Sequence, residues 1–280
     1  MIRRTFSTVI LWTALGGVLY GFGPHAGVWL IALLAVASQH EMYRMLESTG
    51  GRPLRLAGLI VGAVLVLGPF YGTLTFDGFD PRLTALSVLA LGTILAAVCV
   101  LARPHPHRIS ALGATSLGLV FVAFPLHFFV QILLLPADPT AGLLLALWVI
   151  VAVKFADIGA YVFGSLIGKH KLAPELSPGK TWEGVGGGLA SSVLLACGFA
   201  AVFGEHLPSA LTPLNAAALA LPIAAISVPS DLLESVFKRE SGAKDSGRTI
   251  PGIGGAYDLS DSLILSAPVA FVLLHLFIFP

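Results

Sequence analysis

The ionisable residues of this sequence are concentrated in one stretch, residues 231–262, which lies between two long apolar runs. Ionisable groups are costly at membrane depth, and where they occur there they are candidates for function. Carboxylates suit Mg²⁺, and lysine and arginine bind phosphate, so the stretch predicts a magnesium- and phosphate-binding site. A solvated cytoplasmic loop would explain the cations but not the acids. The acids are Asp231, Glu234, Glu240, Asp245, Asp258 and Asp261, and the cations are Lys238, Arg239, Lys244 and Arg248.

The spacing of these residues predicts two groups on two helices. Asp231 begins a series at i, i+3, i+4 and i+7, so these side chains share one face if the preceding apolar run continues as a helix. The series consists of Asp231, Glu234, Ser235 and Lys238. Asp258 and Asp261, at the start of the next apolar run, also share a face. Between the groups, residues 251–255 read PGIGG, a non-helical turn that could fold the second group back on the first.

Membrane helices must position these residues. Apolar residues make up 56% of the chain and charged residues 11%, whereas a soluble domain has about 25% charged residues. Several runs reach about 18 apolar residues, enough to cross a bilayer. We therefore expect an all-α, polytopic integral membrane protein of about nine transmembrane helices with two polar cytoplasmic loops. The net charge of +1 gives no reason to expect a nucleic-acid partner. The expected spans are 6–23, 26–39, 56–74, 83–102, 109–134, 140–163, 184–203, 211–229 and 262–279.

The distribution of lysine and arginine predicts the orientation in the membrane. The loops after the second, fourth, sixth and eighth expected spans carry clusters of basic residues. The loops on the opposite side carry almost none, with Arg82 as the exception. Because basic loops stay in the cytoplasm, we expect the N-terminus and both large polar loops to be cytoplasmic and the C-terminus to lie outside.

The other large polar segment, residues 154–184, offers two candidate site residues. Asp157 follows Lys154 by three residues, so either the two form a local ion pair or Asp157 faces the bundle interior and reaches the site. Lys180 precedes an apolar run and could bind an anion at a helix N-terminus. The surrounding SPGKTWEG lacks the glycine spacing of a P-loop. Glycines at 184–188 are typical of close helix packing, or of a backbone that approaches a ligand.

Two further features are expected to be structural. The residues His40, Glu41 and Arg44 follow the second expected span and are typical of interfacial charge. Both cysteines, Cys99 and Cys197, lie inside apolar runs. We expect them to pack as small side chains rather than to form a disulfide.

The charged C-terminal stretch resembles the signature of the phosphatidate cytidylyltransferase (CDP-diacylglycerol synthase) family. That signature runs Ser-x-x-Lys-Arg, then Lys-Asp, a Pro-Gly-His-Gly-Gly turn, and Asp-Arg-x-Asp. The residues that match it in place are Ser235, Lys238, Arg239, Lys244, Asp245, Pro251, Gly252, Gly254, Gly255, Asp258 and Asp261. Two positions depart from it, since Ile253 stands where the family has histidine and Leu259 where it has arginine.

The resemblance extends upstream through DIGAYVFG and GKHKLAPELSPGKTWEG. It therefore divides the chain into N-terminal transmembrane helices, residues 1–139, and a C-terminal catalytic domain, residues 140–280. It implies the transfer of a cytidylyl group from CTP to phosphatidic acid, giving CDP-diacylglycerol and pyrophosphate for phospholipid biosynthesis. The reaction would take place at the cytoplasmic face of the inner (plasma) membrane, and the protein could act as a homodimer.

The resemblance also assigns roles to individual residues. It implies two Mg²⁺ ions, held by Asp231 and Asp258, with Lys238 and Lys244 as further catalytic residues. The residues expected to bind or support the substrates are Ser235, Arg239, Asp245, Arg248, Asp157 and Asp261, together with Lys180.

Three alternatives remain open from the sequence. A CTP-dependent lipid-alcohol kinase would transfer the terminal phosphate and release CDP. A catalytically degenerate membrane relative would keep the helices without turnover, which the two departures at 253 and 259 allow. A transporter would use Asp157 and Asp231 as ion sites, but it should show inverted repeats or broken helices in both halves, whereas the polar residues here are concentrated in the C-terminal half.

Overall fold

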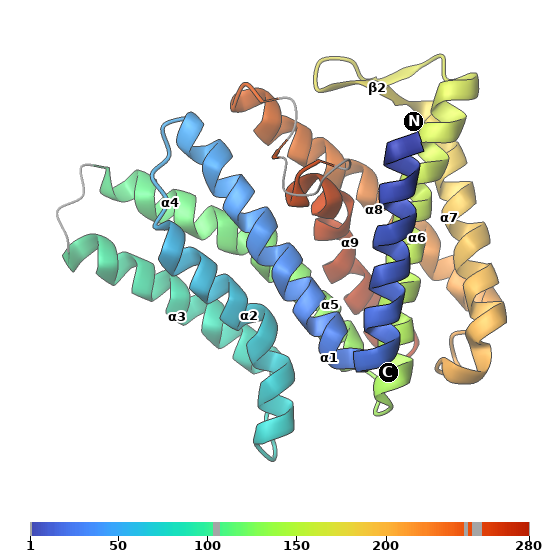
Figure 1. Ribbon diagram of the computed structural model, residues 1–280, viewed down its shortest axis with the longest axis horizontal. Helices are drawn as coiled ribbons and strands as arrows, with labels where there is room; N and C mark the ends of the chain where they lie inside the picture. Colours follow the sequence, from blue (N-terminus) through green and yellow to red (C-terminus); the bar gives the residue numbers. More distant parts are fainter. Residues whose placement is uncertain (1, 103–106, 244–245, 248–253, 280) are drawn as a thin grey trace. The chain divides into compact units, whose positions relative to one another are not determined.

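The computed structural model describes residues 2–102, 107–243, 246–247 and 254–279 (Figure 1). Side chains are described from residue 17 onward, except that of residue 20. The helices are α1 (Ile2–Ser48), α2 (Arg55–Thr75), α3 (Pro81–Ala102), α4 (Arg108–Gly118), η1 (Leu119–Ala123), α5 (Phe124–Leu133), α6 (Pro139–Ile167), α7 (Trp182–Phe203), η2 (Gly204–His206), α8 (Pro213–Glu240) and α9 (Ala256–Phe277). The strands are β1 (Lys171–Ala173) and β2 (Ser177–Thr181).

Within the described residues, eight helices are long and apolar enough to cross a membrane, which confirms a polytopic membrane protein. Large apolar side chains such as Leu56, Leu101 and Leu214 are exposed on them, as expected for surfaces that face lipid. The remaining expected span, 6–23, falls in the first part of α1, most of whose side chains lie outside the described residues.

Helix α1 is interrupted at the position where the sequence separates its first two expected spans. Gly23 has φ 56° and ψ −139°, and Pro24 follows it. A positive φ is accessible to glycine without a steric penalty, and proline removes a backbone donor, so together they break the helix. The helix after the break runs on to Ser48, well beyond the expected end at residue 39.

The chain forms two compact units. The first contains Met1–Gln131 and Phe237–Ser260, and the second contains Ile132–Val236 and Asp261–Pro280. Helices α8 and α9 therefore contribute residues to both units. The expected division at residue 139 follows the family resemblance rather than packing, and it stays a prediction.

Tyr43 lies at the centre of the first unit and is fully buried. Its hydroxyl accepts a hydrogen bond from Gln39 Nε2 (2.8 Å) and donates one to the Thr115 carbonyl (2.9 Å). Gly58 and Gly118 lie against its ring, where an added Cβ would come within 2.1 and 2.2 Å of Tyr43 atoms. Because glycine has no side chain, Gly58 on α2 and Gly118 on α4 leave room for the ring of Tyr43 on α1.

In the second unit, α6 and α7 run side by side (Figure 1). A Cβ on Gly188 would lie 2.6 Å from the Ala156 carbonyl oxygen, and one on Gly184 would lie 2.7 Å from that of Ala160. These glycines allow the two backbones to approach closely, which confirms the packing interpretation of this glycine cluster.

The polar segment between α6 and α7 is shorter than the sequence indicated. Helix α6 continues to Ile167, beyond the expected end at residue 163, and Lys154 and Asp157 are helical as that expected span already placed them. The rest forms an antiparallel hairpin of β1 and β2, the one sheet among the described residues of this otherwise helical fold. Strand β2 ends at Thr181, which is also the N-cap residue of α7. Thr181 Oγ1 accepts a hydrogen bond from Gly184 N (3.1 Å). The hairpin is therefore fixed to the start of α7.

Candidate active site

Three carboxylates of the second unit form a group that could hold a metal ion. Oxygens of Asp231, Glu234 and Asp261, here called the acidic group, all lie within 4.8 Å of one another. Glu234 is buried and the two aspartates are half-buried. Asp231 and Glu234 are three residues apart on α8, which confirms that they share a face, and Asp261 comes from α9. Like charges this close repel one another, and a divalent cation would relieve the repulsion.

Helix α6 supplies a lysine next to this group. Lys154 Nζ donates to Ser262 Oγ (2.8 Å) and Asp157 Oδ2 (3.3 Å), and lies 4.0 Å from Asp261 Oδ1. Ser262 Oγ donates in turn to Asp157 Oδ2 (2.8 Å). Asp157 therefore forms the local pair with Lys154 on its own helix and also contacts α9 through Ser262, while its expected role at the site stays a prediction.

The β-hairpin supplies a second lysine. Lys180 Nζ lies 2.7 Å from Asp231 Oδ2 and 3.5 Å from the Val228 carbonyl oxygen. Ser235 is buried and donates its hydroxyl to the Asp231 carbonyl (3.0 Å), and its expected contact with substrate stays a prediction. Lys180 is thus a described cation in direct contact with the acidic group.

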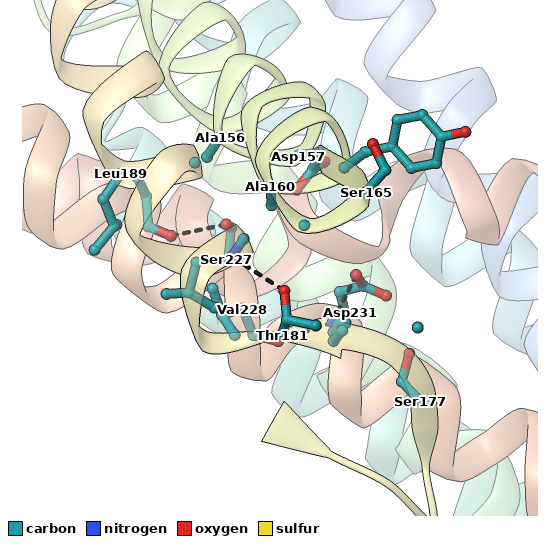
Figure 2. Close-up of a pocket in the computed structure, with 18 residues that line it drawn as sticks. Ala156, Asp157, Ala160, Ser165, Ser177, Thr181, Leu189, Ser227, Val228 and Asp231 are labelled. Carbon is teal, nitrogen blue, oxygen red and sulfur yellow. Dashed lines mark hydrogen bonds and ion pairs between the residues drawn. The ribbon is translucent and has the colours of Figure 1, made fainter. Parts of the chain in front are cut away.

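A pocket of about 370 Å³ opens beside this lysine, between α6, α7, α8 and the hairpin. Asp157, Lys180, Thr181 and Asp231 contribute polar atoms to its wall, while residues such as Leu189 make the rest apolar. In Figure 2, Leu189 lies on the opposite side of the pocket from Asp231. An elongated ligand with a charged end and an uncharged body would suit such a pocket.

Asp258 belongs to the first unit and has different surroundings. Its carboxylate accepts hydrogen bonds from Lys238 Nζ (3.1 Å), Gly255 N (2.8 Å) and Ser246 N (3.3 Å). Ser246 Oγ accepts a hydrogen bond from Asp258 N (3.2 Å). Lys238 therefore contacts an acid of the signature, and the expected role of Asp258 as a metal ligand stays a prediction.

Glu41 joins the same region, and its expected role as interfacial charge is wrong. The side chain is 1% exposed. Its Oε2 accepts hydrogen bonds from Ser246 Oγ (2.9 Å) and Tyr257 N (2.9 Å). Helix α1 extends past residue 39, so Glu41 lies inside the unit rather than in a connecting loop. Glu41, Ser246 and Asp258, with the groups that bond them, are called the Glu41–Asp258 network below.

The structure brings together some of the expected site residues and leaves others undescribed. In the second unit, Asp231 and Asp261 belong to the acidic group, and Asp157 and Lys180 lie beside it. Arg239 is exposed on the last turn of α8. Three expected site residues fall outside the described part of the chain, namely Lys244, Asp245 and Arg248. The departure from the signature at Ile253 falls outside it as well.

Sequence reasoning missed several residues that take part in these contacts. Lys154 and Ser262 support the acidic group, and Glu234 belongs to it, although the sequence placed Glu234 on the same helix face as Asp231 without giving it a role at the site. A lysine within an apolar run, as at Lys154, is the signal that could have identified the first of these. Ser262 carries no comparable signal, because a serine in a membrane helix is common.

Comparison with known proteins shows which family the chain resembles. The model of the "Cytidylyltransferase family" matches residues 2–277. A phosphatidate cytidylyltransferase of Haemophilus influenzae is 48% identical over 131 residues, which cover 47% of this chain and 46% of that protein. One from Pseudomonas aeruginosa is 46% identical over 133 residues, covering 48% and 47%. In these two matches the chain spans about half the length of its relative.

A longer match has lower identity. A phosphatidate cytidylyltransferase of Mycobacterium leprae is 30% identical over 295 residues, covering 98% of this chain and 88% of that protein. One from Bacillus subtilis is 32% identical and covers 79% and 78%. The family match over almost the whole chain includes both the N-terminal helices and the acidic group. This chain therefore belongs to the cytidylyltransferase family.

Proposed function

We propose that this protein transfers the cytidylyl group of CTP to phosphatidic acid, releasing pyrophosphate. The observation that carries the proposal is the acidic group beside Lys180 and its pocket, in a membrane protein of the cytidylyltransferase family. The relatives that match this chain over most of its length bear the name phosphatidate cytidylyltransferase, which supports the same substrates.

The chemistry requires charge control more than proton transfer. A phosphate oxygen of the lipid attacks the α-phosphorus of CTP, a new P–O bond forms, and the bond from that phosphorus to the bridging oxygen breaks. The pyrophosphate leaves with that electron pair. The attacking phosphate is already ionised near neutral pH, so a strong general base is not required. The main barrier is the approach of two polyanions, and fixed cations lower it.

The acidic group fits a divalent metal ion. Its three carboxylates offer only oxygen ligands, come from two helices, and lie close enough to share one ion. In our proposal Asp231, Glu234 and Asp261 hold Mg²⁺, and Asp258 holds the second ion that the family resemblance implies. Bound Mg²⁺ would neutralise negative charge on the phosphates.

The cations of the chain would orient the phosphates. Lys180 lines the pocket and Lys154 holds Asp157 and Ser262, so these two act from the second unit. Lys238 and Arg239 at the end of α8 are proposed to bind phosphate as well. Lys244 and Arg248 complete the set expected from the signature.

Radiolabelled CTP tests the reaction. Purified protein is incubated with phosphatidic acid and CTP labelled with ³²P at the α-position or at the γ-position. Cytidylyl transfer puts the α-label in the lipid and the γ-label in pyrophosphate. Lipid that is labelled only from the γ-position would identify a kinase, and an unlabelled lipid in both cases would identify a degenerate relative.

The proposal includes a location and an orientation. We place the protein in the inner (plasma) membrane, with the N-terminus and the active site on the cytoplasmic side, because the basic residues favour that side. A reporter in the 169–180 segment should then read as cytoplasmic and one at the C-terminus as extracytoplasmic. Reports from the same side would contradict this orientation. A homodimer is part of the proposal, to be tested by mass measurement in detergent.

A further inference from the structure

Lys180 connects the hairpin to the acidic group, and its ion pair occupies an oxygen that a metal ion would need. The ammonium lies 2.7 Å from Asp231 Oδ2. We propose that Lys180 is a positioning residue that neutralises Asp231 in the metal-free protein and transfers to a substrate phosphate when a divalent cation binds Asp231. This inference rests on the proposed function.

The charges in the second unit provide the reason for an exchange. Four carboxylates, those of Asp157 and the acidic group, face two lysines, Lys154 and Lys180. Lys180 forms an ion pair with Asp231, whereas Lys154 donates hydrogen bonds to Asp157 and Ser262. A divalent cation at Asp231 repels an ammonium at the same carboxylate, so the two compete for it.

The backbone beside Lys180 is fixed, so the exchange requires only side-chain rotation. Thr181 is 4% exposed and caps α7. Trp182 N donates to the His170 carbonyl (3.0 Å), which holds the two ends of the hairpin together. Directly after α6, Gly168 leaves room for Thr181, since a Cβ on Gly168 would lie 2.7 Å from Thr181 Oγ1. The four-carbon stem of Lys180 can move its ammonium through several ångströms from this fixed point.

The pocket gives the released ammonium a destination. Lys180 lines it together with Ser177 and Thr181, and Asp231 lies on the same wall (Figure 2). A triphosphate that reaches the metal at Asp231 would bring its oxygens within range of the displaced ammonium. The exchange thus sets an order, in which the cation binds first and prepares Lys180 for the nucleotide.

The test measures two ligands that should shift in opposite directions. The full chain, purified in detergent, carries Lys180→Met, which keeps the length of the side chain and removes its charge. Binding of Mn²⁺ without nucleotide is followed by electron paramagnetic resonance, and binding of CTP with saturating Mg²⁺ and no lipid by calorimetry. Lys171→Met is the matched control, because Lys171 is an exposed lysine on β1 that pairs in register with Thr181.

We expect Lys180→Met to bind Mn²⁺ about three- to tenfold more tightly and CTP about tenfold more weakly. Lys171→Met should change neither. Weaker binding of both ligands would show that Lys180 is merely structural, and unchanged Mn²⁺ binding would overturn the competition. Tighter Mn²⁺ binding with unchanged CTP binding would overturn the transfer to phosphate.

A second variant shows whether the effects of Lys180→Met come from the lost charge or from misfolding. Lys180→Gln keeps a hydrogen-bond donor for Asp231 without the charge, and it should show the same two opposite shifts. Wild-type turnover separates this inference from the proposed function. A wild type that makes CDP-diacylglycerol while both variants bind Mn²⁺ normally leaves the function standing and refutes the exchange. A wild type that binds both ligands without making product refutes the function.

Discussion

The acidic group and the Glu41–Asp258 network both bury carboxylates, but they neutralise them by different means. In the network, carboxylates accept hydrogen bonds from backbone N–H groups and a serine hydroxyl, and Lys238 adds one cation. In the acidic group, lysine side chains from α6 and the hairpin provide the nearby positive charge.

This difference separates fixed carboxylates from exchangeable ones. A backbone donor has its position set by the fold and cannot leave without local unfolding. A lysine side chain can rotate away and be replaced by a metal ion. We therefore expect the acidic group to be the stronger cation site, and the network to hold the backbone of Ser246, Gly255 and Tyr257 in place even where Asp258 takes up the proposed second ion. Four predictions test this comparison.

Removing the charge of Asp231 should have the largest effect. Asp231→Asn is expected to lower turnover about a thousandfold or more, because a metal ligand and the partner of Lys180 are lost together. The thermal midpoint in detergent should stay the same or rise, since one of three mutually repelling acids is neutralised. Full activity across a magnesium titration would remove Asp231 from the metal site.

Asp261 and Asp258 lie three residues apart on α9 and provide a direct comparison. Asp261→Asn should weaken Mn²⁺ binding about tenfold or more, because it removes a charged oxygen ligand of the acidic group. Asp258→Asn should weaken it less, because Asp258 lies outside the acidic group and its oxygens already accept hydrogen bonds from Lys238 and from the backbone N–H groups of Ser246 and Gly255. A larger loss in Asp258→Asn would support the signature-based metal pair of Asp231 and Asp258 instead.

Glu41 should matter for stability rather than for metal binding. Glu41→Ala removes a buried charged acceptor of two hydrogen bonds, which should cost about 3 kcal/mol of unfolding free energy. Glu47→Ala is the control, because Glu47 forms an exposed ion pair with Arg55 and should cost less than about 1 kcal/mol. Thermal unfolding in detergent measures both. Equal losses would mean that the network does not stabilise the first unit.

The smallest effect is expected at Leu259, where the family signature has arginine. Leu259→Arg adds a cation next to Asp258 on a half-buried position of α9. Turnover should stay within about threefold of wild type or rise, because acids that can accept the charge are already present. A wild type without turnover that gains it in the Ile253→His, Leu259→Arg double variant would be a degenerate relative.

Much of the helical architecture could be predicted from the sequence, because apolar length and proline or glycine breaks act locally. The continuation of α8 from the apolar run to Glu240 follows from the i, i+3, i+4 and i+7 series. The break at Gly23 follows from the Gly-Pro pair. The extension of α1 past residue 39 could not be predicted, because it buries the charged Glu41. That burial depends on hydrogen-bond donors from Ser246 and Tyr257, more than 200 residues later in the sequence.

The candidate site was predictable in composition but not in its grouping. The spacing on α8 pairs Asp231 with Glu234, and the structure confirms it. The choice of Asp261 as the third member depends on how α9 packs in the second unit, which spacing within one helix does not determine. The contact between Lys180 and Asp231 depends on the β1–β2 hairpin. The sequence of this segment, which is polar and contains several glycines and prolines, does not predict a hairpin.

The serines of α9 have a consequence for the order in which the protein is made. Ser262 bonds Lys154 and Asp157 of α6, Ser266 Oγ donates to the Ile223 carbonyl of α8 (3.3 Å), and Ser230 of α8 donates to the Asp261 carbonyl. Alone in a bilayer, a helix with two aspartates and several hydroxyls is poorly accommodated. Its partners on α6 and α8 leave the ribosome earlier, so α9 can enter the membrane against helices that already offer those bonds.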